Sequence, residues 1–497
     1  MPKKISKVLS ALSLLFLSTA CCPLLQSKNN YGVCVNRGWG SQKEVDSPTV
    51  LTTNDSTPST ASVDSREGII YSWQTDRFTW GQRSLFRDIH NESKNIGIGH
   101  YVKGSYTEAR TSFLSAISAE SNNPELLIFY NNSKSREGGN VPFTLAAVVP
   151  VDNEIGNAEE MLRGIAQAQD EFNKIGGIDG RLLEVVIAND GNNLDRDKAS
   201  KPVAEQLSRD PSILGVIGHN FSDATEAALP TYDDANIAVI SPTSTSTSLN
   251  NEVFFRTAYK DSLAGEQLAE YAQEHLGISS VVIFYNSQSK YSNSMRQAFE
   301  KRFSQLGGIV MLKDKRESGF NAVSELRDSA LEDMDAALLL AGQDTNINIS
   351  KANSDLPPEK QLKLLGGDSL YGRRKLEAGQ ESLNGMVLSV AWFYDAPCCI
   401  DFASKAAERW NGATINWRSA TSYDATRAFI KVLSQNVTRE EIIEKLKTIE
   451  LPEDETSGQG LRFDDYGERV GEPVLIKTVL SNKVQGLKVG YELVSVD

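Results

Sequence analysis

Segments with two different patterns of hydrophobic and polar residues alternate along most of the chain. In residues 158–175 the apolar side chains Met161, Leu162, Ile165 and Phe172 recur at the spacing of one helical face. Just before them, FTLAAVV is a short, wholly apolar run of the kind found in buried strands. Short apolar runs and helical patterns continue to alternate as far as the run LKLLGGD. This order predicts parallel sheets covered by helices on both faces, an α/β fold.

The α/β part is too long for a single core. It runs for roughly 350 residues from Val141, whereas single hydrophobic cores stop growing at about 250–300 residues. Two α/β lobes are therefore expected. Further helices are predicted at 197–208, 223–235, 261–276, 291–306 and 321–331.

The residues before Val141 follow a different pattern. Residues 22–68 are polar, rich in Ser, Thr, Asn and Asp, and lack apolar periodicity, which predicts a flexible tether. Apolar residues return from 69, and residues 94–131 show helical spacing with a break at Gly104. Their Y-x-x-G-x-Y-x-x-A order resembles one tetratricopeptide repeat. One repeat cannot bury its own apolar face, so we expect a small helical docking module at 69–137 rather than a solenoid.

The first residues have the layout of a secretory signal. Three lysines precede an apolar run at 8–17, and small residues 18–20 stand before Cys21. About ten apolar residues rise only about 15 Å as a helix, half a bilayer. The segment 1–21 resembles a bacterial lipoprotein signal, which implies a lipid anchor on Cys21 and a place on the periplasmic or extracellular face of a membrane. Plain export is the alternative.

Composition and charge exclude several classes of partner. The formal net charge is −14 and no cluster of Lys and Arg stands out, so nucleic acid is not an expected partner. The four His residues lack metal-ligand spacing, and we expect neither a metal site nor a cofactor. Cys34, Cys398 and Cys399 are too few for a disulfide framework and are expected to be free thiols. A link between Cys34 and one of the pair stays open in an oxidising compartment.

Polar residues follow the predicted strands where α/β proteins bind ligands, beyond the carboxyl ends of the strands. Ser222 comes after ILGVIG and directly before a predicted helix. It could simply cap that helix, but the free N–H groups of a helix start also suit a carboxylate ligand. The loop PTSTSTSL follows the strand IAVIS and precedes FFRTAYKD. Because it lies inside the α/β pattern, we interpret it as the polar lining of a site rather than as a spacer.

Two acids occupy comparable positions. Asp261 starts a predicted helix, where it could be a cap, and Asp368 ends the predicted strand LKLLGG. An acid beside a carboxylate site recognises an ammonium group, which would cost several kcal/mol to bury without such a partner. Two acids and two hydroxyl-bearing loops are the groups needed to hold a zwitterion.

Residues 141–497 resemble the type I periplasmic binding proteins, specifically the Leu/Ile/Val-binding receptors of ABC importers. The resemblance implies two Rossmann-like lobes joined by a three-segment hinge, with lobe 1 at 141–261 and 393–470 and lobe 2 at 262–392 and 471–497. It rests on nine short motifs in register, namely GGIDGR, VIANDGNN, GVIGHNFS, ISPTSTSTSL, FFRTAYKDS, KYSNS, LLGGDSLYG, SYDATRAF and GLRFDDYG.

The resemblance also implies contacts on the carboxylate side of a bound amino acid. Ser222, with Phe221 beside it, matches the hydroxyl that binds the ligand carboxylate. Ser244 and Thr245 match the second loop, in which a backbone carbonyl meets the ammonium and a Thr meets the carboxylate.

The other implied contacts are acidic and aromatic. Asp368 matches the acid that clamps the ammonium, Asp261 an acid near the first lobe crossing, and Tyr291 an aromatic residue that closes the site. Gln343 stands where the family often has an aromatic residue, and the loop VDNEIGNAEE offers no aromatic cover. Both departures make the pocket more polar, so a strict preference for branched aliphatic side chains is not expected.

The expected function is that of a substrate-binding receptor that closes two lobes on an amino acid and works with permease and ATPase subunits on other chains. Three alternatives stay open: a sensor subunit that uses the helical unit to dock a signalling partner, a receptor for amides or urea, and a hydrolase. The hydrolase reading rests on GGDSL, which resembles the GDSL esterase block with Ser369 as nucleophile. Those enzymes need a later His, and the last His here is His275.

Overall fold

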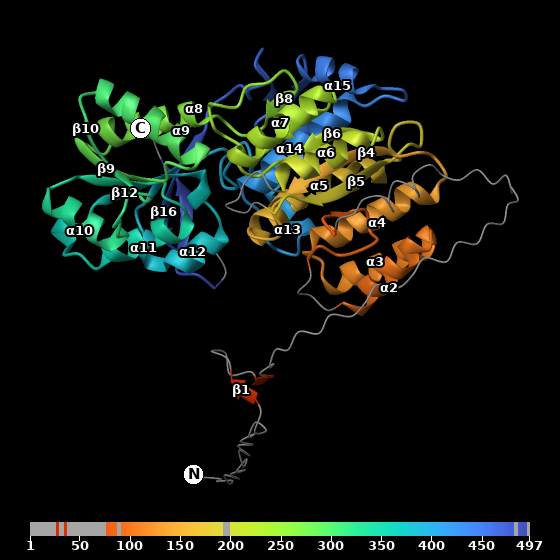
Figure 1. Ribbon diagram of the computed structural model, residues 1–497, viewed down its shortest axis with the longest axis horizontal. Helices are drawn as coiled ribbons and strands as arrows, with labels where there is room; N and C mark the ends of the chain where they lie inside the picture. Colours follow the sequence, from red (N-terminus) through yellow and green to blue (C-terminus); the bar gives the residue numbers. More distant parts are fainter. Residues whose placement is uncertain are drawn as a thin grey trace, which may run out of the picture. The chain divides into compact units, whose positions relative to one another are not determined.

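The computed structural model describes residues 26–28, 34–36, 76–86, 91–191, 199–481 and 486–494. The chain divides into two compact units, Met1–Val63 and Asp64–Asp497. In the first unit, β1 (Gln26–Lys28) and β2 (Cys34–Asn36) form an antiparallel pair within the predicted tether. Cys21 and the predicted signal lie outside the described residues. The second unit contains two α/β lobes and a helical segment (Figure 1).

The sheet of lobe 1 has six strands in the order β3-β5-β4-β6-β7-β8. All neighbouring strands are parallel except β3, which pairs antiparallel with β5 at one edge. The strands are β3 (Phe78–Thr79), β4 (Phe143–Val149), β5 (Leu183–Asn189), β6 (Ile213–Ile217), β7 (Ala238–Ser241) and β8 (Phe254–Arg256). The helices of this lobe are α5 (Ile155–Lys174), α6 (Ser200–Arg209), α7 (Ser222–Asp234), α13 (Ile400–Arg409), α14 (Trp417–Val432) and α15 (Arg439–Leu446).

The sheet of lobe 2 has seven strands in the order β10-β9-β11-β12-β13-β16-β17. It is parallel as far as β13, after which β16 and β17 continue it antiparallel. The strands are β9 (Ser280–Tyr285), β10 (Ile309–Asp314), β11 (Ala336–Leu339), β12 (Lys363–Gly367), β13 (Val387–Val390), β16 (Val474–Leu480) and β17 (Val489–Leu493). The helices are α8 (Asp261–Glu274), α9 (Lys290–Gln305), α10 (Ala322–Leu331), α11 (Gln343–Ser354) and α12 (Arg373–Gly379).

The predicted α/β fold with two lobes is confirmed, with sheets that are mixed at their edges rather than wholly parallel. The chain passes between the lobes three times, from β8 to α8, from β13 to α13, and towards β16 after the small antiparallel pair β14 (Glu450–Leu451) and β15 (Leu461–Arg462). Among the described residues, no helix is both long and apolar enough to cross a bilayer.

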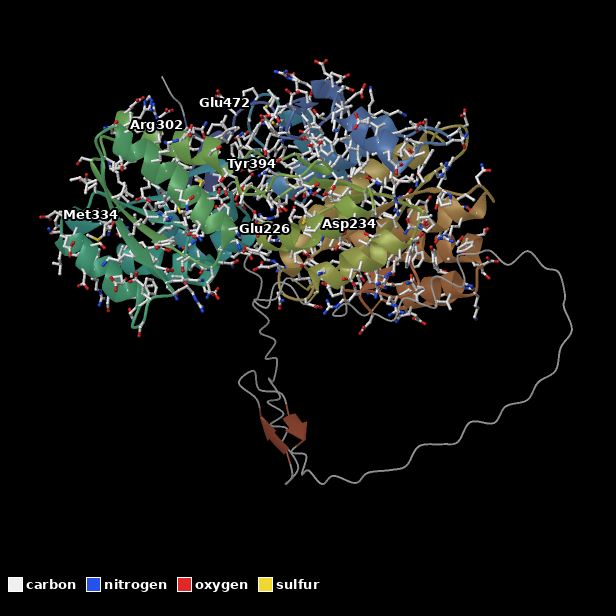
Figure 2. All side chains as sticks on the ribbon, turned by 45° about the horizontal axis from the view of Figure 1, so that its top comes forward. Glu226, Asp234, Arg302, Met334, Tyr394 and Glu472 are labelled. Carbon is white, nitrogen blue, oxygen red and sulfur yellow. The ribbon has the colours of Figure 1, made fainter. Side chains whose placement is uncertain are left out.

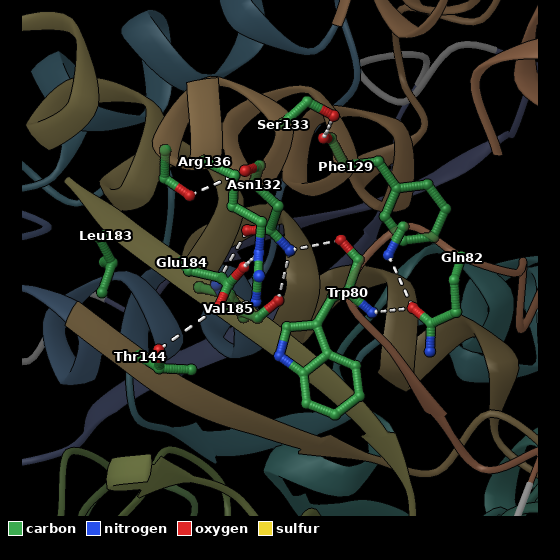
Figure 3. Close-up of polar contacts among 12 residues, drawn as sticks. Trp80, Gln82, Phe129, Asn132, Ser133, Arg136, Thr144, Leu183, Glu184 and Val185 are labelled. Atoms are coloured by element: carbon green, nitrogen blue, oxygen red, sulfur yellow. Dashed lines mark hydrogen bonds and ion pairs between the residues drawn. The ribbon is translucent and has the colours of Figure 1, made fainter. Parts of the chain in front are cut away.

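Three helices precede the first long strand: α2 (Glu92–Val102), α3 (Tyr106–Ala119) and α4 (Pro124–Glu137). The helix α4 lies beside α5 of lobe 1 (Figure 1) and is buried on nearly all sides. Its Asn132 is wholly buried, and Nδ2 donates to the carbonyls of Trp80 and Val185, 2.7 Å away in each case (Figure 3). Its Oδ1 accepts from the Val185 N–H and from Gln169 Nε2.

A buried ion pair also joins α4 to lobe 1. Arg136 Nε of α4 lies 2.5 Å from Glu184 Oε1 of β5, and the Glu184 side chain is fully buried (Figure 3). A buried carboxylate is tolerated only when it is paired and hydrogen-bonded. The helix α4 therefore shares the core of lobe 1.

Candidate functional site

The Ser- and Thr-rich loop after β7 is packed into lobe 1. Its residues 241–246 are buried, and only Thr247 and Ser248 reach the surface. Ser241 Oγ accepts from the Ser244 N–H, and the Ser244 hydroxyl donates to the His219 carbonyl. Side-chain hydroxyl groups thus make the hydrogen bonds to the backbone that water would otherwise make. This explains why so polar a segment is ordered and buried.

Arg256 of β8 fixes the shape of this loop. Its side chain is fully buried, and its guanidinium donates to the carbonyls of Ser244, Ser246 and Leu249 at 2.9–3.1 Å. Glu468 lies 2.9 Å from Arg256 Nε and balances its charge. The planar fork of an Arg suits such convergent carbonyls.

Ser222 and Asp261 do not cap helices. The caps of α7 and α8 are Phe221 and Lys260, and neither side chain makes a capping hydrogen bond. Ser222 Oγ instead accepts from the Ser246 N–H at 3.2 Å, which links the start of α7 to the polar loop. The expectation that these two residues could act as N-caps is wrong, because the residue before each of them is the cap. Helix capping therefore does not explain why Ser222 and Asp261 occur at these positions.

Two acids meet in a small gap between the lobes. A cavity of about 10 Å³, room for about one water, is lined by Thr245 and Asp261, by Tyr291 of α9 and by Asp368 after β12. Asp261 is 2% exposed, and its Oδ2 has no hydrogen-bond partner among the described residues. An ammonium group would satisfy this oxygen.

Burial is the main cause of the raised pKa of both carboxyl groups. It raises the pKa of Asp261 to about 8, an effect that the nearby charge of Asp368 increases and that hydrogen bonds from Thr245 and Ser294 oppose. Burial also raises the pKa of Asp368 to about 6, while the Arg418 guanidinium and a hydrogen bond from Tyr291 lower it. The pair of carboxyls therefore holds a proton at neutral pH.

A larger cavity of about 410 Å³ adjoins the gap. Tyr291 lines both spaces, and its hydroxyl lies 3.1 Å from Ser369 Oγ. The larger cavity is lined by polar and charged side chains from both lobes, together with a few apolar ones: Asn153, Glu154, Asn157, Phe221, Asp223, Asn286, Ser289, Leu340, Gln343, Asn346, Lys375 and Arg418. The charged side chains of this lining can hold charged groups of a ligand.

The position of α14 determines where Arg418 lies in this cavity. Gly164 of α5 faces the Ser419 carbonyl so closely that any side chain there would collide with it. The Ser419 hydroxyl also donates to the Glu160 carbonyl at 2.9 Å. These contacts hold the first turn of α14 against lobe 1, with Arg418 stacked over Trp417.

The two lobes and their common gap correspond to a known protein family. The family described as periplasmic binding protein matches residues 149–479, well over half of the chain. The chain belongs to the periplasmic binding proteins. The predicted relation to type I receptors of the Leu/Ile/Val-binding group is confirmed by the relatives of this binding protein.

Its curated relatives match part of the chain. An "Amino acid binding protein" of Pseudomonas aeruginosa is 28% identical over 181 residues, 35% of this chain and 47% of the relative. The Leu/Ile/Val-binding protein of Escherichia coli strain K12 is 28% identical over 171 residues, 34% of this chain and 45% of the relative. The binding protein thus spans about half the length of the curated relatives it matches.

Solved structures match over most of both lobes. A leucine binding protein from Thermotoga maritima has a TM-score of 0.61 at 19% identity and covers 71% of this chain and 98% of its own. A branched-chain amino acid substrate binding protein from Streptococcus pneumoniae in complex with isoleucine has a TM-score of 0.60 at 19% identity, with 71% and 100% covered. A solute binding protein from Rhodopseudomonas palustris in complex with 3,4-dihydroxy benzoic acid has a TM-score of 0.61 at 16% identity, with 71% and 96% covered.

The structure places the predicted site residues in three groups. Thr245, Asp261 and Asp368 line the small gap. Phe221 and Gln343 line the larger cavity, and Tyr291 lines both. Ser222 and Ser244 line neither space, and their hydroxyls bond to the backbone of the polar loop and its neighbours.

Sequence reasoning missed three basic residues of the binding protein. Arg256 supports the polar loop, and Lys375 and Arg418 line the larger cavity. Arg256 stands inside the motif FFRTAYKDS, where a buried strand ending in Arg was an available signal. Cys398 and Cys399, in the second lobe crossing, are free thiols with sulfur atoms 2.8 Å apart.

Proposed function

We propose that the protein is an extracytoplasmic receptor that binds an amino acid between its two lobes and delivers it to an ABC importer. The observation that supports this proposal is the pair of acids, Asp261 at the first lobe crossing and Asp368 of lobe 2, that line one gap beside Thr245 of lobe 1. An unpartnered, buried Asp261 oxygen suits a ligand ammonium, and the start of α7 with its polar loop suits a carboxylate.

Contacts across the gap supply the closing mechanism. The Thr247 N–H of lobe 1 donates to Ser294 Oγ of lobe 2 at 2.9 Å. Lys290 of α9 lies 3.1 Å from Glu226, which Figure 2 shows on the side of lobe 1 that meets lobe 2. A gap with room for about one water admits an amino acid only when the lobes separate or Tyr291 moves. A ligand that contacts both lobes then favours the closed state.

The remaining parts of the proposal come from the sequence. We assign residues 1–21 to a signal, Cys21 to a lipid anchor, 141–261 and 393–470 to lobe 1, and 262–392 and 471–497 to lobe 2. A permease and an ATPase on other chains would be the partners. Co-purification of these subunits with the protein separates an importer receptor from a sensor.

Titration calorimetry of the purified protein against the twenty amino acids and urea tests the ligand class. We expect heat with at least one amino acid at micromolar affinity, about −8 kcal/mol. The Asp368→Asn variant should weaken that binding at least about 30-fold, because the ammonium then faces no ionised acid on lobe 2. Asp333→Asn, an exposed acid of the same lobe, is the matched control and should bind normally.

Other outcomes identify other receptor classes. Binding of urea or a simple amide alone would make the protein an amide receptor. Binding of a benzoate alone would place it with receptors such as the Rhodopseudomonas palustris protein. Normal amino acid affinity in Asp368→Asn would overturn the ammonium clamp.

A further inference from the structure

Two basic side chains line the larger cavity but not the small gap that the proposal assigns to the ammonium. Arg418 comes from α14 of lobe 1, and Lys375 comes from α12 of lobe 2. Both line the cavity of about 410 Å³ although they are only 6% and 8% exposed. Each lobe therefore contributes one buried cation to the same space.

Neither cation has a close carboxylate. Among the described residues, no acidic oxygen lies within 4.0 Å of either charged group, although buried arginines elsewhere in the chain, such as Arg136 and Arg469, are paired with Glu184 and Asp424. Arg418 Nε is buried without a hydrogen-bond partner, and its guanidinium stacks on Trp417 at 4.4 Å. Lys375 Nζ donates to the neutral side chain of Gln343.

More distant acidic residues do not neutralise the charges of Arg418 and Lys375. Asp368, Glu154 and Glu160 act on Arg418, and Glu154 and Asp344 act on Lys375, yet burial and mutual repulsion lower the pKa of Lys375 to about 8. Asp223 also lines the cavity, and its carboxylate accepts a hydrogen bond from the Lys290 N–H at 3.3 Å. A buried cation without a partner is costly, and an anionic ligand group would remove that cost.

We propose that Arg418 and Lys375 form an anion subsite, so that the amino acid taken by this receptor carries a second acidic group, as glutamate does. This inference rests on the proposed function, since the same ligand places its ammonium at Asp368. The guanidinium of Arg418 can hold a carboxylate with two parallel hydrogen bonds, and Lys375 adds a point charge from the opposite lobe. The second acidic group thus bridges the lobes and favours their closure.

Calorimetry with glutamate, glutamine, leucine and glutarate tests this subsite. Glutamine has nearly the shape of glutamate without its side-chain charge, and glutarate keeps both carboxylates without the ammonium. We expect glutamate to bind at least about 10-fold more tightly than glutamine, and we expect added salt to narrow the difference.

The Arg418→Gln variant should weaken glutamate binding at least about 30-fold, and it should weaken glutamate binding more than it weakens glutamine binding. Lys375→Gln should act in the same direction with a smaller effect. Arg374→Gln is the matched control, because Arg374 precedes Lys375 on α12, pairs with Glu159 and does not line the cavity of about 410 Å³. The comparison of glutamate with glutamine in the unaltered protein tests the subsite even if a variant misfolds.

The outcomes separate the two proposals. Glutamine or leucine bound as tightly as glutamate would overturn the anion subsite and leave the amino acid receptor standing. Glutarate bound without any amino acid, with a loss in Arg418→Gln, would support the subsite and overturn the ammonium site. Failure of both glutamate and glutarate to bind would overturn the subsite.

Discussion

Asp261 controls the charge balance of the gap between the lobes. Its carboxyl is almost fully buried, and its pKa of about 8 means that it holds a proton at neutral pH. In the unfolded chain the same carboxyl has its ordinary pKa of 3.8. Between these two values the folded protein binds more protons than the unfolded chain, so the free energy of unfolding falls as the pH rises.

Replacing Asp261 by Asn should remove this contribution. The free energies of unfolding of the variant and the unaltered protein should be similar near pH 4 and diverge in favour of Asp261→Asn up to about pH 8, by more than about 1 kcal/mol. Urea denaturation at several pH values measures the difference, and Asp333→Asn is the exposed control. A difference that does not change with pH would show that Asp261 ionises normally.

Single residues of the site were predictable when their position followed from a strand end. Asp368 directly follows a buried strand, and Thr245 belongs to a polar loop after another, so the geometry of parallel sheets places both at the same edge. Arg418 and Lys375 stand on helices, where an Arg or Lys usually faces solvent. Their burial depends on how α14 packs on α5 and how the lobes meet, which local sequence does not encode.

The helix α4 shows the limits of prediction for an element. The helical spacing of its segment was visible, and so was the start at Pro124. Its union with lobe 1 was not, because it depends on polar side chains, Asn132 and Arg136, that find their partners in β5. Polar residues on a helix normally predict a solvated face.

The Asn132→Leu variant should destabilise lobe 1 strongly. It removes the four hydrogen bonds of Asn132 and leaves the N–H and carbonyl of Val185 and the carbonyl of Trp80 buried without a partner. Each unsatisfied buried group costs about 1–3 kcal/mol, so we expect a loss of at least about 3 kcal/mol in the free energy of unfolding.

The matched control for this change is Asn140→Leu, since Asn140 is exposed and makes one long hydrogen bond to Gly180. Its effect should stay below about 1 kcal/mol. Urea denaturation followed by circular dichroism compares the two variants. Equal losses in both would show that the contacts of Asn132 do not hold α4 to lobe 1.

At the scale of the whole molecule, the two lobes and their three connections could be foreseen. The length of the α/β pattern required two cores, and the nine motifs in register implied the order of the crossings. The sizes of the two cavities could not be foreseen, because they depend on how closely the lobes approach each other. The antiparallel strands β16 and β17 were also unexpected, since they extend a sheet that the helix–strand alternation predicted to be parallel.

The proposed anchor also belongs to the whole molecule. When the full chain is expressed in a bacterium with lipoprotein processing, we expect it in the membrane fraction and soluble only in detergent, because a lipid chain on Cys21 holds it there. Cys21→Ser should move the protein to the soluble extracytoplasmic fraction, and the adjacent Cys22→Ser is the matched control. Membrane retention of Cys21→Ser would contradict lipidation at this residue.

The short strand β3 has a consequence for any shortened form of the protein. By pairing Phe78 and Thr79 with β5, it occupies the outer hydrogen-bonding groups at one end of the first sheet. A fragment that began at residue 141, just before β4, would present the bare backbone of β5 to other chains. Open sheet margins of this kind recruit strands from neighbouring molecules and promote aggregation. The stretch before the binding lobes thus also shields the protein against self-association.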